Sequence, residues 1–251
     1  MRFIFIPLIA VFCFTTYGQG TFSIGSGAQI KSSGGIYVVL DNMHLLNNGT
    51  IQQNSGDGVF KFTNGGDVII SGTGAIVLSK IHLNKSVNSS VLLQCNVTVL
   101  DEIRFTSGLL NLGNRVLDLG NTGVLTTESE TSHAYSNGTG YLQANASLNG
   151  PQAVNPGNLG AVITSPQNLG PTVVRRGHNA QSSLGDAGHS ILRYYDIVPT
   201  NNTALNATIR MYYLDAELNN LNESFLQLFR SEDNIVWTNQ GFSTRPLRAV
   251  N

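Results

Sequence analysis

Short apolar runs separated by polar turns dominate the chain between residues 20 and 130. The runs span three to five residues and are joined by turn residues such as Asn48 with Gly49 and Gly120 with Asn121. Glycine and asparagine accept the positive φ angles of tight turns. No window carries apolar residues at the helical i, i+3, i+4, i+7 spacing, so we expect no long helix. The expected strands lie at 36–40, 59–62, 67–70, 75–78, 97–100, 109–112, 116–119 and 123–126.

The spacing of these strands favours a right-handed parallel β-helix, or β-solenoid, over residues 19–130. Within groups of neighbouring strands, strand starts recur at irregular intervals of about 6 to 10 residues, and some sets of two or three strands repeat after about 20 residues. A β-helix has short strands, frequent corners and apolar or asparagine side chains stacked on successive coils. One coil cannot bury its apolar face alone, so stacking must supply the core. A sandwich of even-length hairpins remains the alternative.

The pattern changes after residue 130. Residues 131–158 are rich in Asn, Gly and Ser and contain Pro151 and Pro156, which is typical of a linker or loop. In 207–214, Ile209 and Met211 alternate with polar residues, as in a half-buried antiparallel strand. The expected strands of this region are 160–164, 172–176, 191–198, 207–214, 224–230 and 234–238.

Six such segments predict an immunoglobulin-like β-sandwich over residues 159–251. A sandwich of this kind usually has seven or more strands, and the last expected segment ends at residue 238. We therefore expect an incomplete sandwich and a chain that is a fragment of a longer reading frame. The predicted fold is all-β, a β-solenoid followed by this truncated module.

The first 18 residues have the pattern of a secretory signal peptide. Arg2 precedes an apolar run that is too short for a bilayer span of about 20 residues. Thr16 and Gly18 are the small residues of a cleavage site, so the mature chain should start near Gln19. Removal of this leader leaves Cys95 as the single cysteine, which excludes an internal disulfide. Its strand-like apolar neighbours predict a small buried hydrophobe rather than a reactive thiol.

Composition narrows the class of protein further. The 14 basic and 15 acidic side chains give a net charge of −1, which excludes a polybasic nucleic-acid binder. Only 12% of the residues are charged, whereas about 25% is usual in globular domains. The 41% hydrophobic content is too high for a disordered polyelectrolyte. The sequence therefore indicates a weakly charged, turn-rich β protein.

Three sequence segments of the second region resemble segments of large exported surface proteins of the Bacteroidetes. They occupy residues 163–178, 191–202 and 211–219. In those proteins a repetitive β-helical stretch precedes such a module, and a type IX secretion or gliding-motility sorting domain often ends the chain. The resemblance covers roughly residues 100 to 240, rests on no catalytic signature and implies an adhesin-like or matrix role. No sorting domain is recognisable within the printed sequence, which leaves the export route undetermined.

Parallel β-helices include polysaccharide lyases, so the sequence could also encode an enzyme. Such sites gather acidic residues for Ca²⁺ or acid catalysis and a basic residue on one face. The only local group is Asp101, Glu102 and Arg104, in which Glu102 and Arg104 share a strand face and are expected to form a surface pair. The remaining acids of the first region are scattered, at Asp41, Asp57, Asp67, Asp118, Glu128 and Glu130.

The second region offers four further groups. Asp215 and Glu217, predicted on one strand face, and the following Glu223 are candidate ligands for a structural Ca²⁺ ion, although a polar strand end is favoured. His178, Asp186 and His189 have no recognised zinc spacing and are expected in a solvated loop.

Arg175 and Arg176 are neighbours in a strand and must point to opposite faces, so at most one can serve a site. A set of aromatic residues can either stack on sugars or, as favoured, form core and rim of the sandwich: Tyr194, Tyr195, Tyr212, Tyr213 and Trp237.

The leading hypothesis is an exported, non-enzymatic structural or adhesive protein at the cell surface. A β-helical stalk would hold the sandwich away from the cell, where it meets a glycan or another surface protein. No catalytic residue, cofactor, nucleic acid or membrane span after leader cleavage is expected. The alternative is a polysaccharide-active lyase or hydrolase with the sandwich as an accessory. Three carboxylates and a base gathered in one groove would favour that alternative.

Overall fold

The computed structural model describes residues 19–182 and 188–241. The predicted signal peptide, Asp186 of the predicted loop and the last ten residues lie outside the described residues. The protein is all-β, with 51% of residues in strands and 4% in helices. The helices are three short 3-10 turns, η1 (Pro156–Asn158), η2 (Asp215–Glu217) and η3 (Glu223–Phe225). The predictions of an all-β protein and of a first region without long helices are confirmed.

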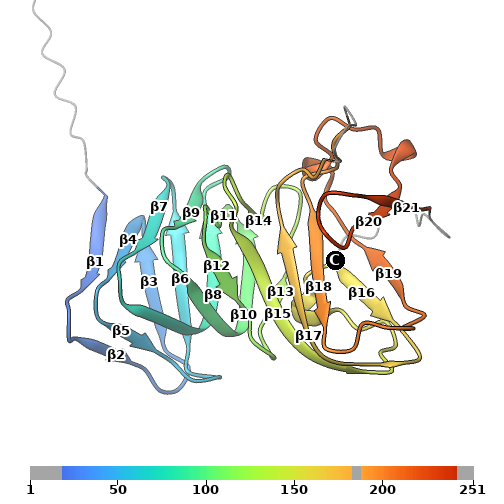
Figure 1. Cartoon of the computed structure of the whole chain (residues 1–251). Helices are drawn as coiled ribbons and strands as arrows, with labels where there is room; N and C mark the ends of the chain where they lie inside the picture. Colours follow the sequence, from blue (N-terminus) through green and yellow to red (C-terminus); the bar gives the residue numbers. More distant parts are fainter. Residues whose placement is uncertain (1–18, 183–187, 242–251) are drawn as a thin grey trace, which may run out of the picture.

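The first part of the chain is a parallel β-solenoid of about six turns, stacked from β1 toward the C-terminal strands (Figure 1). Each coil takes about 19 to 25 residues, since Leu110 lies opposite Val91 and Ile70 lies opposite Leu45. The first face of the solenoid is a six-stranded parallel sheet: β1 (Gly20–Ile24), β4 (Met43–Asn47), β7 (Val68–Ser71), β9 (Ser90–Leu93), β11 (Leu109–Asn111) and β14 (Ala134–Tyr135).

The other two faces are joined by long bent strands. β8 (Ala75–Lys85) and β10 (Val97–Ser107) contribute their first halves to the second face and their second halves to the third face. The second face also contains β2 (Gln29–Lys31), β5 (Thr50–Gln52), β12 (Val116–Asp118) and β15 (Tyr141–Asn149). The third face also contains β3 (Tyr37–Asp41), β6 (Val59–Asn64) and β13 (Val124–Thr126).

Apolar side chains stack inside the solenoid on successive coils. Along the third face, Leu40, Phe62, Leu83 and Phe105 lie opposite one another and are at most 2% exposed. The parallel register places each of these side chains directly above its counterpart in the previous coil. These stacks belong to one continuous core, which explains how coils too thin to fold alone become stable together.

Cys95 packs at the edge of this core. It is partly exposed, and its Sγ atom lies 3.8 Å from the carbonyl oxygen of Ile70. Burial raises the pKa of the Cys95 thiol, with the charge of Arg115 acting in the opposite direction. The structure thus places Cys95 against apolar neighbours as a protonated thiol.

The stretch 131–158, expected to be a linker, instead contains the sixth coil. β14 and β15 continue the first and second faces, and Leu142, Ala144 and Leu148 of β15 point into the core. Because small and polar residues alternate with the inner residues of β15, the sequence of this strand does not show an obvious alternation of apolar and polar residues. An Asn- and Ser-rich outer face is compatible with a strand whose inner residues are buried.

After β15, the predicted strands 160–164, 172–176, 191–198 and 207–214 each overlap an observed strand. The predicted strand 224–230 forms only over residues 228–230, and 234–238 is wrong except at residue 238, where β21 begins. The observed strands are also arranged differently from the expectation. β17 (Asn168–Gly177) pairs antiparallel with β15, and β18 (Tyr194–Pro199) pairs with β17, so both strands extend the second face. Two small antiparallel sheets complete the region: β16 (Ala161–Thr164) with β19 (Thr208–Met211), and β20 (Leu228–Arg230) with β21 (Thr238–Gly241).

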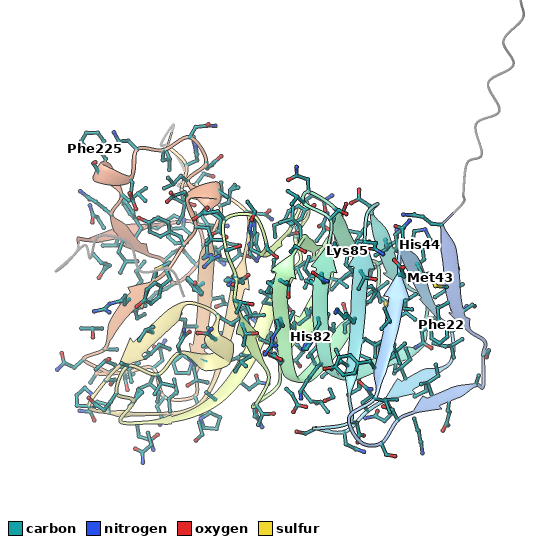
Figure 2. The ribbon with its side chains drawn as sticks, turned by 180° about the vertical axis from the view of Figure 1, so that it is seen from behind. Phe22, Met43, His44, His82, Lys85 and Phe225 are labelled. Atoms are coloured by element: carbon teal, nitrogen blue, oxygen red, sulfur yellow. The ribbon has the colours of Figure 1, made fainter. Side chains whose placement is uncertain are left out.

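This arrangement does not confirm the immunoglobulin-like sandwich. The last solenoid coil leaves a free strand edge, and β17 satisfies its backbone hydrogen bonds by pairing there rather than within a separate domain. Residues 215–217 also differ from the predicted strand, because they form the 3-10 turn η2. Figure 2 shows the side chains along the molecule, with Phe22 and Met43 at the β1 end and Phe225 at the far end.

Candidate functional site

A charged cluster lies on the outer side of the third face. His82 of β8 and Arg104 of β10 are direct neighbours in register, and both contact Glu102. His82 Nε2 lies 3.2 Å from Glu102 Oε2, and Arg104 Nη2 lies 3.2 Å from Oε1. Thr126 of β13 donates a further hydrogen bond of 2.7 Å to Glu102. Figure 2 shows His82 midway along the solenoid.

The surroundings of this cluster keep its carboxylate ionised. Burial acts to raise the pKa of Glu102, but the hydrogen bonds of Thr126 and His82 and the charge of Arg104 outweigh it and lower the pKa. Burial lowers the pKa of His82, although Glu102 acts in the opposite direction. At neutral pH the cluster therefore contains a charged carboxylate, a neutral imidazole and a guanidinium. It can bind an anionic or hydroxylic group or transfer a single proton.

Asp101, next in sequence, serves the solenoid corner instead. Its carboxylate accepts hydrogen bonds from the hydroxyls of Ser55 and Ser79, both 2.5 Å, and from the backbone N–H of Gly56 at 2.8 Å. Burial acts to raise the pKa of Asp101, and these hydrogen bonds more than offset it. Asp101 thus joins three successive coils and does not add a second carboxylate to the Glu102 cluster.

A second charged group is buried where the solenoid meets the C-terminal strands. Arg176 of β17 is fully buried, and Glu128 lies between β13 and β14. The guanidinium donates two hydrogen bonds to the two oxygens of Glu128, each 2.7 Å long. The outward side chain of the adjacent Arg175 confirms that the two arginines point to opposite faces.

The same junction contains a second ion pair. Arg193 Nε lies 2.9 Å from Glu217 Oε2, and the backbone N–H of Leu214 donates a 2.8 Å hydrogen bond to this carboxylate. His178 Nδ1 lies 3.5 Å from Glu217 Oε1. All three charged or titratable side chains are at least 95% buried. Through Glu217, η2 is therefore linked to Arg193, which precedes β18, and to His178, which follows β17.

Glu130 makes the third link across this junction. Its two carboxylate oxygens accept hydrogen bonds from the backbone N–H groups of Asp215, at 3.0 Å, and Ala216, at 2.9 Å. The first N–H groups of a helical turn have no partner within the turn, and at η2 the carboxylate of Glu130 accepts their hydrogen bonds. We name Glu128, Arg176, His178, Arg193 and Glu217 the junction network.

Burial and charge shift the titration of the junction network strongly. Burial acts to raise the pKa of Glu128, but Arg176 lowers it to about 2. The pKa of Glu217 is also about 2, because His178 and Arg193 outweigh its burial. Burial lowers the pKa of His178 to about 4, against the effect of Glu217. At neutral pH the network thus holds two carboxylates, two guanidinium groups and a neutral imidazole.

A cavity of about 170 Å³ borders the junction network. Its lining includes His133, Tyr135, His178 and Glu217. The Nε2 atom of His178 is buried without a hydrogen-bond partner, as are Arg176 Nε and Arg193 Nη2. A neutral imidazole whose Nδ1 faces a carboxylate presents a lone pair at Nε2, so this atom can accept a hydrogen bond.

The structure does not gather the predicted calcium ligands. Glu217 is buried against Arg193, whereas Glu223 accepts a 2.8 Å hydrogen bond from Tyr213. Asp215 lies in η2, where its backbone N–H contacts Glu130. Within residues 19–182 and 188–241, no group of three His, Cys, Asp or Glu side chains is placed to hold a metal ion.

The predicted histidine group separates in space. His178 is buried in the junction network, whereas His189 is exposed and lies 3.4 Å from the carbonyl oxygen of Asn219. In the sequence, Glu128 and Glu130 are two of the scattered acids of the first region. Only the contacts of Glu128 with Arg176 and of Glu130 with η2 identify them as junction residues. No local sequence signal marks such long-range pairs.

The predicted aromatic group is also divided. Tyr195 is partly buried against the core and donates a 2.8 Å hydrogen bond to the carbonyl oxygen of Leu159. Tyr194, its neighbour in β18, points to the outer side of the sheet, opposite Gly177 of β17. Trp237 has a buried Nε1 atom without a partner. One residue of the predicted group therefore reaches the outer face of the extended second sheet.

Comparisons of the chain with protein-family models, curated proteins and solved structures find no match. Among the described residues, no helix has the length and apolar character needed to cross a bilayer.

Proposed function

We propose that this protein is an exported, non-enzymatic structural or adhesive protein. The β-solenoid would act as a stalk, and the strands β16 to β21 would form the module that it presents. The observation that carries the proposal is the second face, in which hydrogen-bonded strands run without a break from β2 to β18. A continuous sheet leaves no flexible linker between stalk and module.

The contacts at the junction support the same proposal. β15 and β17 pair along nine residue positions, and the junction network adds bidentate pairing of Glu128 with Arg176. Buried ion pairs contribute more to specific geometry than to net stability in several proteins. Here they would fix the orientation of the module relative to the solenoid axis, as a stalk that presents a binding surface requires.

The proposed location is the outer surface or the medium. It is supported by the leader pattern of residues 1–18 and by the resemblance to exported Bacteroidetes proteins. A glycan or another surface protein is the proposed partner. An immunoglobulin-like organisation of the C-terminal strands belongs to the same proposal.

Expression of the full chain with an epitope tag in a Bacteroidetes host tests the location. We expect the leader to be removed near Gln19, and the tag to be accessible to protease or antibody on intact cells or present in the medium. A chain retained with its leader in the cytoplasm would contradict the proposal. A variant with Arg2 and the apolar run deleted is the matched control for leader-dependent export.

A polysaccharide-active protein is the second candidate, with the Glu102 cluster as its site, although the cluster holds one carboxylate rather than the three that would favour an enzyme. Ionised Glu102 and neutral His82 lie together beside Arg104, with Lys61 and Lys80 as neighbours in register. Lyases use such basic groups to stabilise charge or to remove a proton. The cluster contains the single carboxylate of Glu102, whereas most glycosidases use a pair of carboxylates.

Reducing-end release from polygalacturonate, alginate and xylan separates the two candidates. An enzyme would release reducing ends, and Glu102→Gln or Arg104→Ala would abolish release, whereas Thr106→Ala, on the same strand, would retain it. For a non-enzymatic stalk we expect no release from any of these polymers. Release that depends on Glu102 would replace our first proposal.

A further inference from the structure

An aromatic and polar surface lies outside the sheet where solenoid and C-terminal strands join. Tyr141 of β15, Gly177 of β17 and Tyr194 of β18 are opposite one another in register. In the next row, Gln143, Arg175 and Asp196 are opposite one another. We name Tyr141, Gln143, Arg175, Tyr194 and Asp196 the tyrosine–arginine platform.

Gly177 allows the Tyr194 ring to lie across the sheet. A Cβ atom added to Gly177 would be 2.1 Å from both Cε1 and Cζ of Tyr194. The ring therefore covers the backbone of Gly177 and reaches toward Tyr141 on the other side. A glycine covered by the aromatic side chain of a neighbouring strand is a recurrent way to support an aromatic ring on a sheet.

Arg175 is held in place in the row next to the two tyrosines. Its guanidinium carbon lies 5.6 Å from the centroid of the Tyr141 ring. Its Nε donates a 3.0 Å hydrogen bond to Gln143, and its Nη1 donates a 2.8 Å hydrogen bond to Asp196. These contacts orient the guanidinium before any ligand binds, which reduces the entropic cost of binding.

The platform also offers polar groups to solvent. The side chains of Arg175 and Asp196 are 37% and 47% exposed, so both donors and acceptors remain accessible beside the rings. Burial raises the pKa of Tyr194, as do the nearby Asp196 and Tyr141, which keeps its phenol a hydrogen-bond donor at neutral pH. Flat aromatic surfaces flanked by donors and acceptors suit a ligand that is apolar on its faces and polar at its edges.

The polar row continues from the platform along the solenoid. Asp118, Thr98, Gln52 and Lys31 lie in the same cross-strand row as Gln143, with Val77 between Thr98 and Gln52. Neighbouring strands are about 4.8 Å apart, so the row repeats hydrogen-bonding groups at short, regular intervals. An extended polymer with polar groups at each unit can contact several members of this row at once.

We propose that the tyrosine–arginine platform binds a polysaccharide, with pyranose rings stacked on Tyr141 and Tyr194. Pyranose rings have C–H groups on their faces and hydroxyls at their edges. Arg175, Asp196 and Gln143 would bond the hydroxyls, and the polar row would receive the following sugar units. This inference rests on the adhesive function proposed above and names its ligand class and its site.

Affinity electrophoresis of the mature chain through gels containing xylan, laminarin, alginate or hydroxyethyl cellulose tests the site. We expect retardation by at least one polymer, and about tenfold weaker binding for Tyr194→Ala and Tyr141→Ala. Tyr37→Ala is the matched control, because Tyr37 is 62% exposed but lies on the third face of the first coil. Gly177→Ala should weaken binding by displacing the Tyr194 ring without removing it.

Each outcome has a separate meaning. If the protein binds a polymer and Tyr194→Ala and Tyr141→Ala bind it equally well, the platform is not the binding site. The proposed adhesive function would still stand. No retardation by any of the four polymers would overturn the inference, and surface display of the tagged chain would then decide whether the exported function stands. Thermal unfolding of each variant shows whether a loss of binding reflects a loss of folding.

Discussion

At the residue scale, glycine and asparagine determine where the solenoid can turn. Most non-glycine residues with positive φ among the described residues are asparagines, including Asn42 and Asn88 between strands and Asn64 at the end of β6. Other corners require glycine because coils approach closely. A Cβ atom on Gly74 would be 2.0 Å from the carbonyl oxygen of Gly49, and one on Gly49 would be 2.2 Å from that of Ala28.

We therefore expect Gly74→Ala to destabilise the protein by about 1–3 kcal/mol, because the added methyl group meets backbone that must shift. Gly25→Ala is the matched control, since a Cβ atom there meets nothing within 4 Å. Its effect should stay within about 0.5 kcal/mol. Urea unfolding followed by circular dichroism measures both values, and equal effects would show that this corner is not tightly packed.

The buried pair of Glu128 and Arg176 leads to a second prediction at this scale. Glu128→Gln leaves the fully buried Arg176 without its carboxylate partner, and we expect a loss of about 3–5 kcal/mol. The double variant Glu128→Leu with Arg176→Met removes both charges and should lose less than Glu128→Gln. Urea unfolding of the wild-type protein and the two variants checks this order, and a double variant that loses as much stability as Glu128→Gln would contradict the pairing.

At the element scale, the unit of stability is a stack of side chains from successive coils. Leu83 of β8 lies between Phe62 of β6 and Phe105 of β10 and is fully buried. Each short strand contributes one or two such side chains, so the strand is stable only between its neighbours.

Leu83→Ala should therefore cost about 2–5 kcal/mol, because the neighbouring coils cannot close around the cavity. Val87→Ala, in the turn after β8, is the control, because Val87 is 66% exposed and should change stability by less than about 0.5 kcal/mol. The midpoint of urea unfolding gives both values. A small loss for Leu83→Ala would mean that the coils are packed loosely.

The sequence predicts these elements unevenly. Strands with apolar inner residues, such as 59–62 within β6, are evident from their local pattern. β15 was missed because its inner Ala144 and outer asparagines resemble a loop. The opposition of Tyr141 and Tyr194 depends on two strand registers through β17, which no local pattern determines.

At the scale of the whole molecule, the junction network makes stability depend on pH. His178 faces Glu217, with Arg176 and Arg193 nearby, and its pKa of about 4 lies below the ordinary value of 6.5. As pH falls below 6.5, the unfolded chain binds this proton first, so stability is lost progressively down to pH 4. Glu128 and Glu217, with pKa values of about 2, add a further loss between about pH 4.5 and 2.

We expect His178 alone to contribute a loss of roughly 3 kcal/mol between pH 6.5 and 4. Urea unfolding at several pH values measures this slope, and His178→Gln should flatten it. His82, whose pKa burial also lowers, should leave part of the slope in that variant. An unchanged slope in His178→Gln would show that His178 is not buried in its neutral form.

The sequence by itself determined the all-β class and the parallel solenoid, because both follow from local features. Short apolar runs define strands, and asparagine or glycine corners restrict the path between them. Tertiary structure alone decided that β17 pairs with β15, that Arg176 meets Glu128 and that Tyr141 and Tyr194 share one surface. Those contacts join residues far apart in the chain, and they depend on a free strand edge and on register, which exist only once the coils have stacked.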